Sequence, residues 1–189
     1  MRLREYREKP PEIVTIDGID YTLNNDFADC ITTIEALCDE ELFDFEKAEI
    51  IISNMYSEPY PEDTNEAIRL AVNYLMQGRE ITEQDQKRPV VLDFEKDEQW
   101  IYDAFMRIGI DLYKAKMSYW EFMSRLRELP GDCMLSRVIY WRSVPYGKLS
   151  KEEKAAIEKI GKDKIFIQNK ENAAERSDEY NEFMALLKG

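Results

Sequence analysis

Residues 93–112 have the sequence DFEKDEQWIYDAFMRIGIDL, and this stretch decides the helical half of the fold. Its apolar side chains recur with helical spacing, at Trp100, Ile101, Ala104, Phe105 and Ile108. Such a stripe predicts an amphipathic helix with one face on a core. The carboxylates that precede the stripe are expected in the first helical turn, where the helix dipole favours negative charge: Asp93, Glu95, Asp97 and Glu98. Gly109 ends the helix.

Further helices follow towards the C-terminus. Residues 119–130, YWEFMSRLRELP, form an aromatic stripe that stops at Pro130. An S-x-x-E capping box, Ser118 with Glu121, predicts where this helix begins. Residues 132–142, DCMLSRVIYWR, predict the next helix with Asp132 as its cap. A second capping box, at Ser150 and Glu153, opens a lysine-rich helix, and residues 162–168 fit either a helix or a short strand.

Towards the N-terminus, residues 12–23, EIVTIDGIDYTL, place two short β-forming runs around Asp17-Gly18, a dipeptide favoured in tight hairpin turns. Three amphipathic helices are expected after it. The second is expected to be capped by Asp44 and to place Phe45 on its inward face, and the third to be capped at Thr64 or Asn65.

These patterns predict a mostly α protein, a helical bundle in two lobes with one N-terminal β-hairpin. We expect an acidic lobe of hairpin and three helices over residues 1–78, a linker over 79–92, an aromatic helical lobe over 93–168, and a tail over 169–189 that carries a terminal amphipathic helix. The linker contains a polar run without apolar periodicity and Pro89.

Charge is distributed unevenly along the 189 residues, whose formal net charge is −13. Residues 10–78 hold 16 carboxylates against Lys47 and Arg69, a net charge of −14, whereas residues 107–170 have a net charge of +6. The polarisation is typical of a solvated acidic face, and the alternative is a surface for a basic partner or for head-to-tail contact between copies. A surface this acidic argues against nucleic-acid binding through phosphates.

The sequence contains no histidine. The commonest general base and metal ligand is therefore missing, and no nucleotide-binding or hydrolase motif is present. We expect no enzyme, no catalytic or metal-binding residues and no cofactor. Cys30, Cys38 and Cys133 are expected to be reduced. No signal peptide or long apolar run is found, so we expect no membrane partner and a location in the cytoplasm.

Aromatic side chains that fall beside the inward stripes are candidates for a partner-binding surface, where amphipathic aromatics concentrate. In the helical lobe these are Tyr102, Trp120 and Trp141. In the tail, the stripe of the helix expected at Ser177–Leu187 adds Tyr180, Phe183 and Leu187. This helix could pack on its own core, on another copy or on a client protein.

Five segments in order resemble the "gene product fifteen" family of tailed phages of Gram-positive hosts: IDGIDYTLNNDF, DFEKDEQWIYDAF, GIDL, YWEFMSRLRELP and the V-I-x-W-R tract at Val138–Arg142. The resemblance runs from about residue 13 to about residue 167. This chain departs from the family pattern at Met106-Arg107-Ile108 and in its tail, which puts an identical partner interface in doubt.

The resemblance implies a tail assembly chaperone, because the family is generally encoded just ahead of the tape-measure protein. Such a chaperone would bind the tape-measure protein or other phage tail proteins and keep the tape measure soluble in the host cytoplasm until the tail tube polymerises. Homo-oligomerisation is left open. The alternatives are a structural tail component of the virion, an acidic DNA mimic that inhibits a host DNA-binding protein and, last, a carboxylate- or metal-dependent enzyme.

Overall fold

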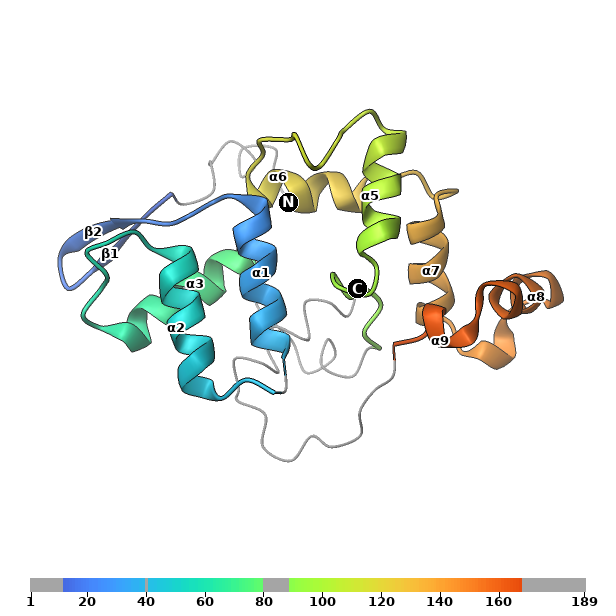
Figure 1. Cartoon of the computed structure of the whole chain (residues 1–189), viewed down its shortest axis with the longest axis horizontal. Coiled ribbons are helices and arrows are strands. Elements are labelled where there is room, and N and C mark those ends of the chain that lie inside the picture. Colours follow the sequence, from blue (N-terminus) through green and yellow to red (C-terminus); the bar gives the residue numbers. More distant parts are fainter. Residues whose placement is uncertain (1–11, 40, 80–88, 168–189) are drawn as a thin grey trace. The chain divides into compact units, whose positions relative to one another are not determined.

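A computed structural model describes residues 12–39, 41–79 and 89–167. The described residues are mostly helical and contain one two-stranded hairpin near the N-terminus, which confirms the predicted fold class (Figure 1). The chain divides into two compact units. Unit 1 comprises Met1–Glu80 and Lys116–Ser124, and unit 2 comprises Ile81–Ala115 and Arg125–Gly189.

The hairpin of unit 1 pairs β1 (Ile13–Ile16) with β2 (Ile19–Thr22) in antiparallel register, with Ile16 opposite Ile19. Asp17 and Gly18 have φ values of 51° and 78°. Two successive positive φ values are the geometry of the turn predicted from the Asp-Gly dipeptide. A two-stranded sheet is marginal alone, and β1 contacts α3 (Thr64–Leu75), so the hairpin is held against the helices.

Three helices build the body of unit 1. α1 (Phe27–Cys38) packs against α2 (Asp44–Met55), and α2 packs against α3. The side chains that they bury include Ile34, Leu37, Ile51, Met55, Ala71 and Leu75. These residues follow the helical period of the sequence, so packing confirms the predicted stripes over most of their length.

The beginnings of two of these helices differ from expectation by one residue. Asp63, not Thr64 or Asn65, caps α3, because its carboxylate accepts the backbone N–H of Glu66 at 3.0 Å. α2 begins after Phe43, and the Glu46 carboxylate accepts the N–H of Phe43. Phe45 was expected inward, but it is 64% exposed because it lies in the first turn, ahead of the part of α2 that packs on the core.

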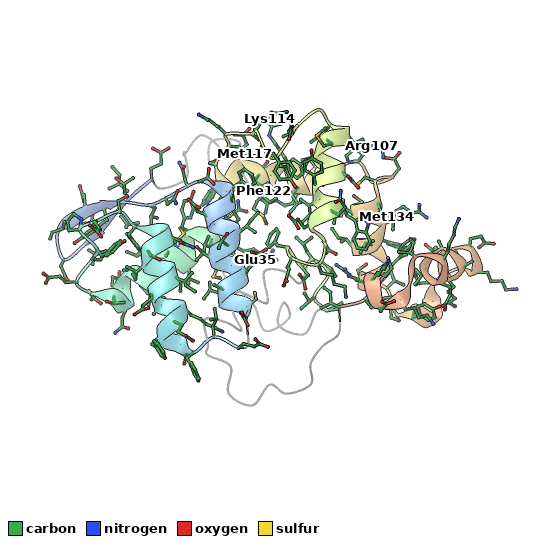
Figure 2. The ribbon with its side chains drawn as sticks, viewed as in Figure 1. Glu35, Arg107, Lys114, Met117, Phe122 and Met134 are labelled. Carbon is green, nitrogen blue, oxygen red and sulfur yellow. The ribbon has the colours of Figure 1, made fainter. Side chains whose placement is uncertain are left out.

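The first part of α6 (Tyr119–Arg127) belongs to unit 1. The N–H of Tyr119 donates to the carbonyl of Asn25 at 2.8 Å, and the ring of Phe122, labelled on this helix in Figure 2, stacks on Phe27 at a centroid distance of 5.1 Å. The sequence placed this helix in the second lobe. Its apolar stripe was identified, but a stripe does not specify which core it enters.

Unit 2 contains α5 (Glu98–Arg107), α7 (Met134–Ser143), the 3-10 helix η2 (Tyr146–Lys148), α8 (Lys151–Ile160) and α9 (Lys162–Ile165). α5 contacts α7, and α8 contacts α9. A buried cluster holds the last helices together, consisting of Val138, Trp141, Leu149, Ile157 and Ile165.

Several boundaries in unit 2 were predicted and others were not. The capping box of Ser150 and Glu153 is present in both directions, at 3.1 and 2.7 Å. Cys133, not Asp132, caps α7, because its Sγ accepts the N–H of Ser136. Ile108 is 39% exposed, because α5 ends at Arg107 and its last predicted stripe position falls outside the helix.

The expected linker is only partly described. Val91 and Leu92 are buried, and the Val91 carbonyl accepts a hydrogen bond from Arg142, so this end of the segment packs in unit 2. The expected terminal helix at Ser177–Leu187 lies outside the described residues.

Candidate partner-binding surfaces

No group of three or more histidine, cysteine, aspartate or glutamate side chains could hold a metal ion within residues 12–39, 41–79 and 89–167. Over the same residues, no helix is both long enough and apolar enough to cross a membrane. Unit 1 has a hollow of about 370 Å³, lined by polar groups that include Glu12, Asn24 and Asn54. Asn24 is already engaged there, because its amide nitrogen donates to Asp29 and to the Asn54 carbonyl.

Trp120 is a half-buried side chain of unit 1. Its indole N–H donates to the carbonyl of Tyr74 at 3.1 Å, and its ring lies 5.8 Å from the ring of Tyr74. The neighbouring Tyr119 is buried and donates its hydroxyl to the Leu75 carbonyl at 3.0 Å. The two side chains donate to backbone carbonyls of the last two residues of α3, and the Tyr74 carbonyl also accepts the N–H of Gln77 at 2.9 Å. Trp120 thus has a structural role, and the part of its side chain that stays exposed is still available to a partner.

Tyr102 lies on α5 in unit 2, and its ring packs on that of Tyr113 at 4.9 Å. Tyr113 is 82% exposed, and Met106 on the same helix is also exposed. Lys114, whose ammonium pairs with Asp111 at 2.7 Å, follows Tyr113 in the sequence. Tyr102 therefore forms part of an exposed apolar region, as a partner-binding residue would, and its contact with a partner stays a prediction.

Trp141 was expected on a partner surface, and the structure corrects this placement. Its side chain is 2% exposed and packs with Val138 and Ile157 in the core of unit 2. The Arg137 guanidinium covers the ring at 5.0 Å. Trp141 was assigned to a partner surface because it falls beside the inward stripe. That assignment was wrong because α7 is packed on more than one side. Tyr180, Phe183 and Leu187 lie outside the described residues, so their partner contacts stay predictions.

Phe43 and Phe45 form an exposed aromatic pair that the sequence reasoning missed. They are 68% and 64% exposed, with ring centroids 5.9 Å apart and an angle of 8° between the ring planes. The signal in the sequence is the run LFDFE at 42–46, which places two phenylalanines two residues apart where a helix begins. Residues at that spacing cannot both lie on one inward helical stripe.

A buried ion pair in unit 2 was also missed. Asp97 was expected as a first-turn carboxylate favoured by the helix dipole. Its side chain is fully buried and binds the guanidinium of Arg142 through both oxygens, at 2.5 and 2.8 Å. Arg142 also donates to the carbonyls of Ile165 and Val91, at 2.6 and 3.0 Å. Burial is compatible with both charges because each is paired and hydrogen-bonded.

The pair joins two of the segments quoted above, since Asp97 belongs to DFEKDEQWIYDAF and Arg142 ends the V-I-x-W-R tract. Within the described residues, the Arg142 guanidinium binds one carboxylate and two backbone carbonyls, which are structural groups of unit 2. These segments therefore specify how unit 2 is held together.

Residues 7–164 match the model of the family described as "Bacteriophage Gp15 protein". Neither the curated proteins nor the solved structures yield a significant match to this chain.

Proposed function

Because this chain belongs to the Bacteriophage Gp15 protein family, it is a bacteriophage protein, and we propose that it is a tail assembly chaperone. In this proposal it acts without catalysis in the host cytoplasm. It binds the tape-measure protein and keeps it soluble until tail-tube subunits polymerise around it. The observation that carries the proposal is the family match over residues 7–164. The resemblance adds the expectation that the gene lies just ahead of the tape-measure gene.

The chemistry of a tape-measure client supports a binder of this kind. A long helical client exposes apolar seams that aggregate unless they are covered. A chaperone for such a client needs exposed apolar side chains to cover the seam and a high net charge to keep the complex in solution. This chain has a formal net charge of −13 and exposes Phe43, Phe45, Met106 and Tyr113.

Tyr102 and Trp120 are the described candidates for client contact that keep some exposed surface. Each is anchored by neighbouring groups, Tyr102 by the ring of Tyr113 and Trp120 by its hydrogen bond to Tyr74. An aromatic side chain that is already held in place loses little conformational entropy when a partner covers it. Tyr180, Phe183 and Leu187 complete the proposed set.

Co-expression of the chain with the tape-measure protein of the same phage, followed by affinity capture of the chain, tests the proposal. The proposal predicts that the tape-measure protein is captured with it. A matched pair of variants then examines the candidate residues: Tyr102→Ala is expected to reduce capture, and Tyr140→Ala, which changes another exposed tyrosine of unit 2, is expected to leave it unchanged.

A structural role in the virion is the competing function. A chaperone leaves the assembly when the tube closes around its client, whereas a tail component remains. Mass spectrometry of purified particles separates the two. Detection of the protein in purified particles, in a fixed ratio to tail-tube subunits, would exclude the chaperone role.

A further inference from the structure

An acidic aromatic surface lies at the start of α2. It consists of the stacked rings of Phe43 and Phe45 and of the carboxylates within four residues of them in the chain, Asp39, Glu41, Asp44, Glu46 and Glu49. Lys47 is the one basic residue among the described residues between 39 and 49, and its ammonium donates to the Leu37 carbonyl at 3.2 Å. The surface therefore combines apolar area with negative charge.

Hydrogen bonds fix the backbone of this surface. The N–H of Phe43 donates to the Glu46 carboxylate at 2.8 Å, and the Phe43 carbonyl accepts from the N–H of Lys47 at 3.0 Å. Just before it, the Asp39 carboxylate accepts the N–H of Glu41 at 2.8 Å. The two rings are thus presented by an ordered helix start, which lowers the entropic cost of binding a partner.

The exposure of the pair sets it apart from the other phenylalanines in the described part of the chain. Phe27, Phe94, Phe105 and Phe122 are buried, and Phe166 is half-buried. Two stacked, exposed rings bounded by charge are typical of a protein-binding site. Their carboxylates select a partner that offers apolar area together with cations.

Unit 2 of the same chain has a surface of this complementary kind, the lysine surface. The ring of Tyr146 packs edge-on against Phe166 with centroids 6.0 Å apart. The ammonium groups of Lys162 and Lys154 lie 4.5 and 5.6 Å from the centre of the Tyr146 ring. Lys96 reaches the same place and donates to the Phe166 carbonyl at 2.9 Å. Glu158, which pairs with Lys162 at 2.7 Å, offsets one of these three cations.

We propose that the acidic aromatic surface of one copy binds the lysine surface of a second copy. Phe43 and Phe45 would pack on the half-buried aromatic pair Tyr146 and Phe166, while Asp44 and Glu49 approach Lys154 and Lys162. Each copy carries one surface of each kind, so the contact joins unlike patches and can continue from copy to copy. The inference concerns the chain alone and does not depend on the tape-measure protein.

Sedimentation velocity of the purified full-length chain over a range of concentrations tests the proposal. The wild-type chain is expected to show a weight-average sedimentation coefficient that rises with concentration. Phe43→Ala/Phe45→Ala and Lys154→Gln/Lys162→Gln are each expected to weaken association roughly 30-fold or more, the effect of removing central interface residues. Tyr113→Ala, which removes a more exposed aromatic ring elsewhere, is the matched control and is expected to associate like the wild type.

Mixing the two double variants gives the sharpest result. Each retains the surface that the other lacks, so the mixture is expected to form a one-to-one heterodimer that does not grow further. Circular dichroism of each variant confirms that it is folded. A wild-type chain that stays monomeric overturns the proposal, as does association that survives either double variant or a mixture that forms no heterodimer. If the wild-type chain stays monomeric, a basic segment of another protein becomes the binding partner to test for the acidic aromatic surface.

Discussion

Asp97 and Arg142, 45 residues apart in the sequence, form a bidentate ion pair inside unit 2, with Nη1–Oδ2 and Nη2–Oδ1 distances of 2.5 and 2.8 Å. Asp97 also accepts the N–H of Asp93 at 3.1 Å, so the pair fixes the segment that enters α5. Through Arg142 the same network reaches the last residue of α9. One ion pair thus ties α5, α7 and α9 together.

Removal of one partner of this pair is expected to destabilise unit 2 strongly. Arg142→Met leaves the Asp97 carboxylate buried without its cation, and such a change costs about 3–5 kcal/mol. Urea unfolding measures the loss. Arg107→Met, which breaks the exposed pair with Asp132, is the matched control and is expected to leave the urea midpoint nearly unchanged. Equal shifts for the two variants would contradict the structural role given to Asp97 and Arg142.

Hydroxyl removal from buried tyrosines of unit 1 is expected to have unequal effects. The Tyr119 and Tyr56 hydroxyls donate to the carbonyls of Leu75 and Ala67, at 3.0 and 2.7 Å. Tyr119→Phe and Tyr56→Phe should each lower the free energy of unfolding by about 1 kcal/mol. The Tyr74 hydroxyl is buried and has no hydrogen-bond partner among the described residues, so Tyr74→Phe should cost nothing. Thermal denaturation that ranks Tyr74→Phe as the most harmful of the three would refute this assignment.

Alkaline pH is expected to destabilise unit 1 through Cys30. Burial, together with the negative charges of Asp26 and Asp29, raises the pKa of the Cys30 thiol from 9.0 to about 12. The folded chain keeps this proton at pH values where the unfolded chain loses it. The stability that Cys30 contributes is therefore complete below pH 9 and is lost as the pH rises from 9 to 12.

Cys30→Ala removes this titration. Its free energy of unfolding, measured in urea at a series of pH values, should fall less steeply above pH 9 than that of the wild type. Burial also raises the pKa of Tyr56 and Tyr74, so the variant is still expected to lose some stability at alkaline pH. Parallel curves for variant and wild type would show that Cys30 is not the titrating group.

Binding of the tape-measure protein is expected to weaken as salt is added. Residues 10–78 have a net charge of −14, and attraction between exposed charges is screened over about 10 Å at 0.1 M salt. Affinity measured at low and high salt checks this expectation. An unchanged affinity would assign the binding to apolar contacts alone.

Local features of this fold were predictable from the sequence, and long-range pairings were not. Asp17-Gly18 predicted its turn because two residues determine that geometry, and Ser150 with Glu153 predicted a helix start for the same reason. The entry of Tyr119 and Phe122 into unit 1 depends on contacts with residues far away in the chain. Apolar periodicity shows that a face is buried but does not show what covers it.

The candidate site was predicted less well for a related reason. Tyr102 and Trp120 do keep some exposed surface, but Trp141 lies in the core and the Phe43–Phe45 pair was assigned partly inward. An aromatic residue suits a core and an interface equally, so residue type alone cannot separate the two. The burial of Asp97 was missed because its partner, Arg142, follows 45 residues later.

The proposed chaperone role requires that the chain keep a tape-measure protein soluble. The soluble fraction of the tape-measure protein of the same phage, expressed with and without the chain and separated by centrifugation, tests this role. We expect the tape-measure protein to be insoluble alone and to move to the supernatant, bound to the chain, when both are present. A tape-measure protein that is equally soluble in both cases, or that stays in the pellet beside the soluble chain, would contradict it.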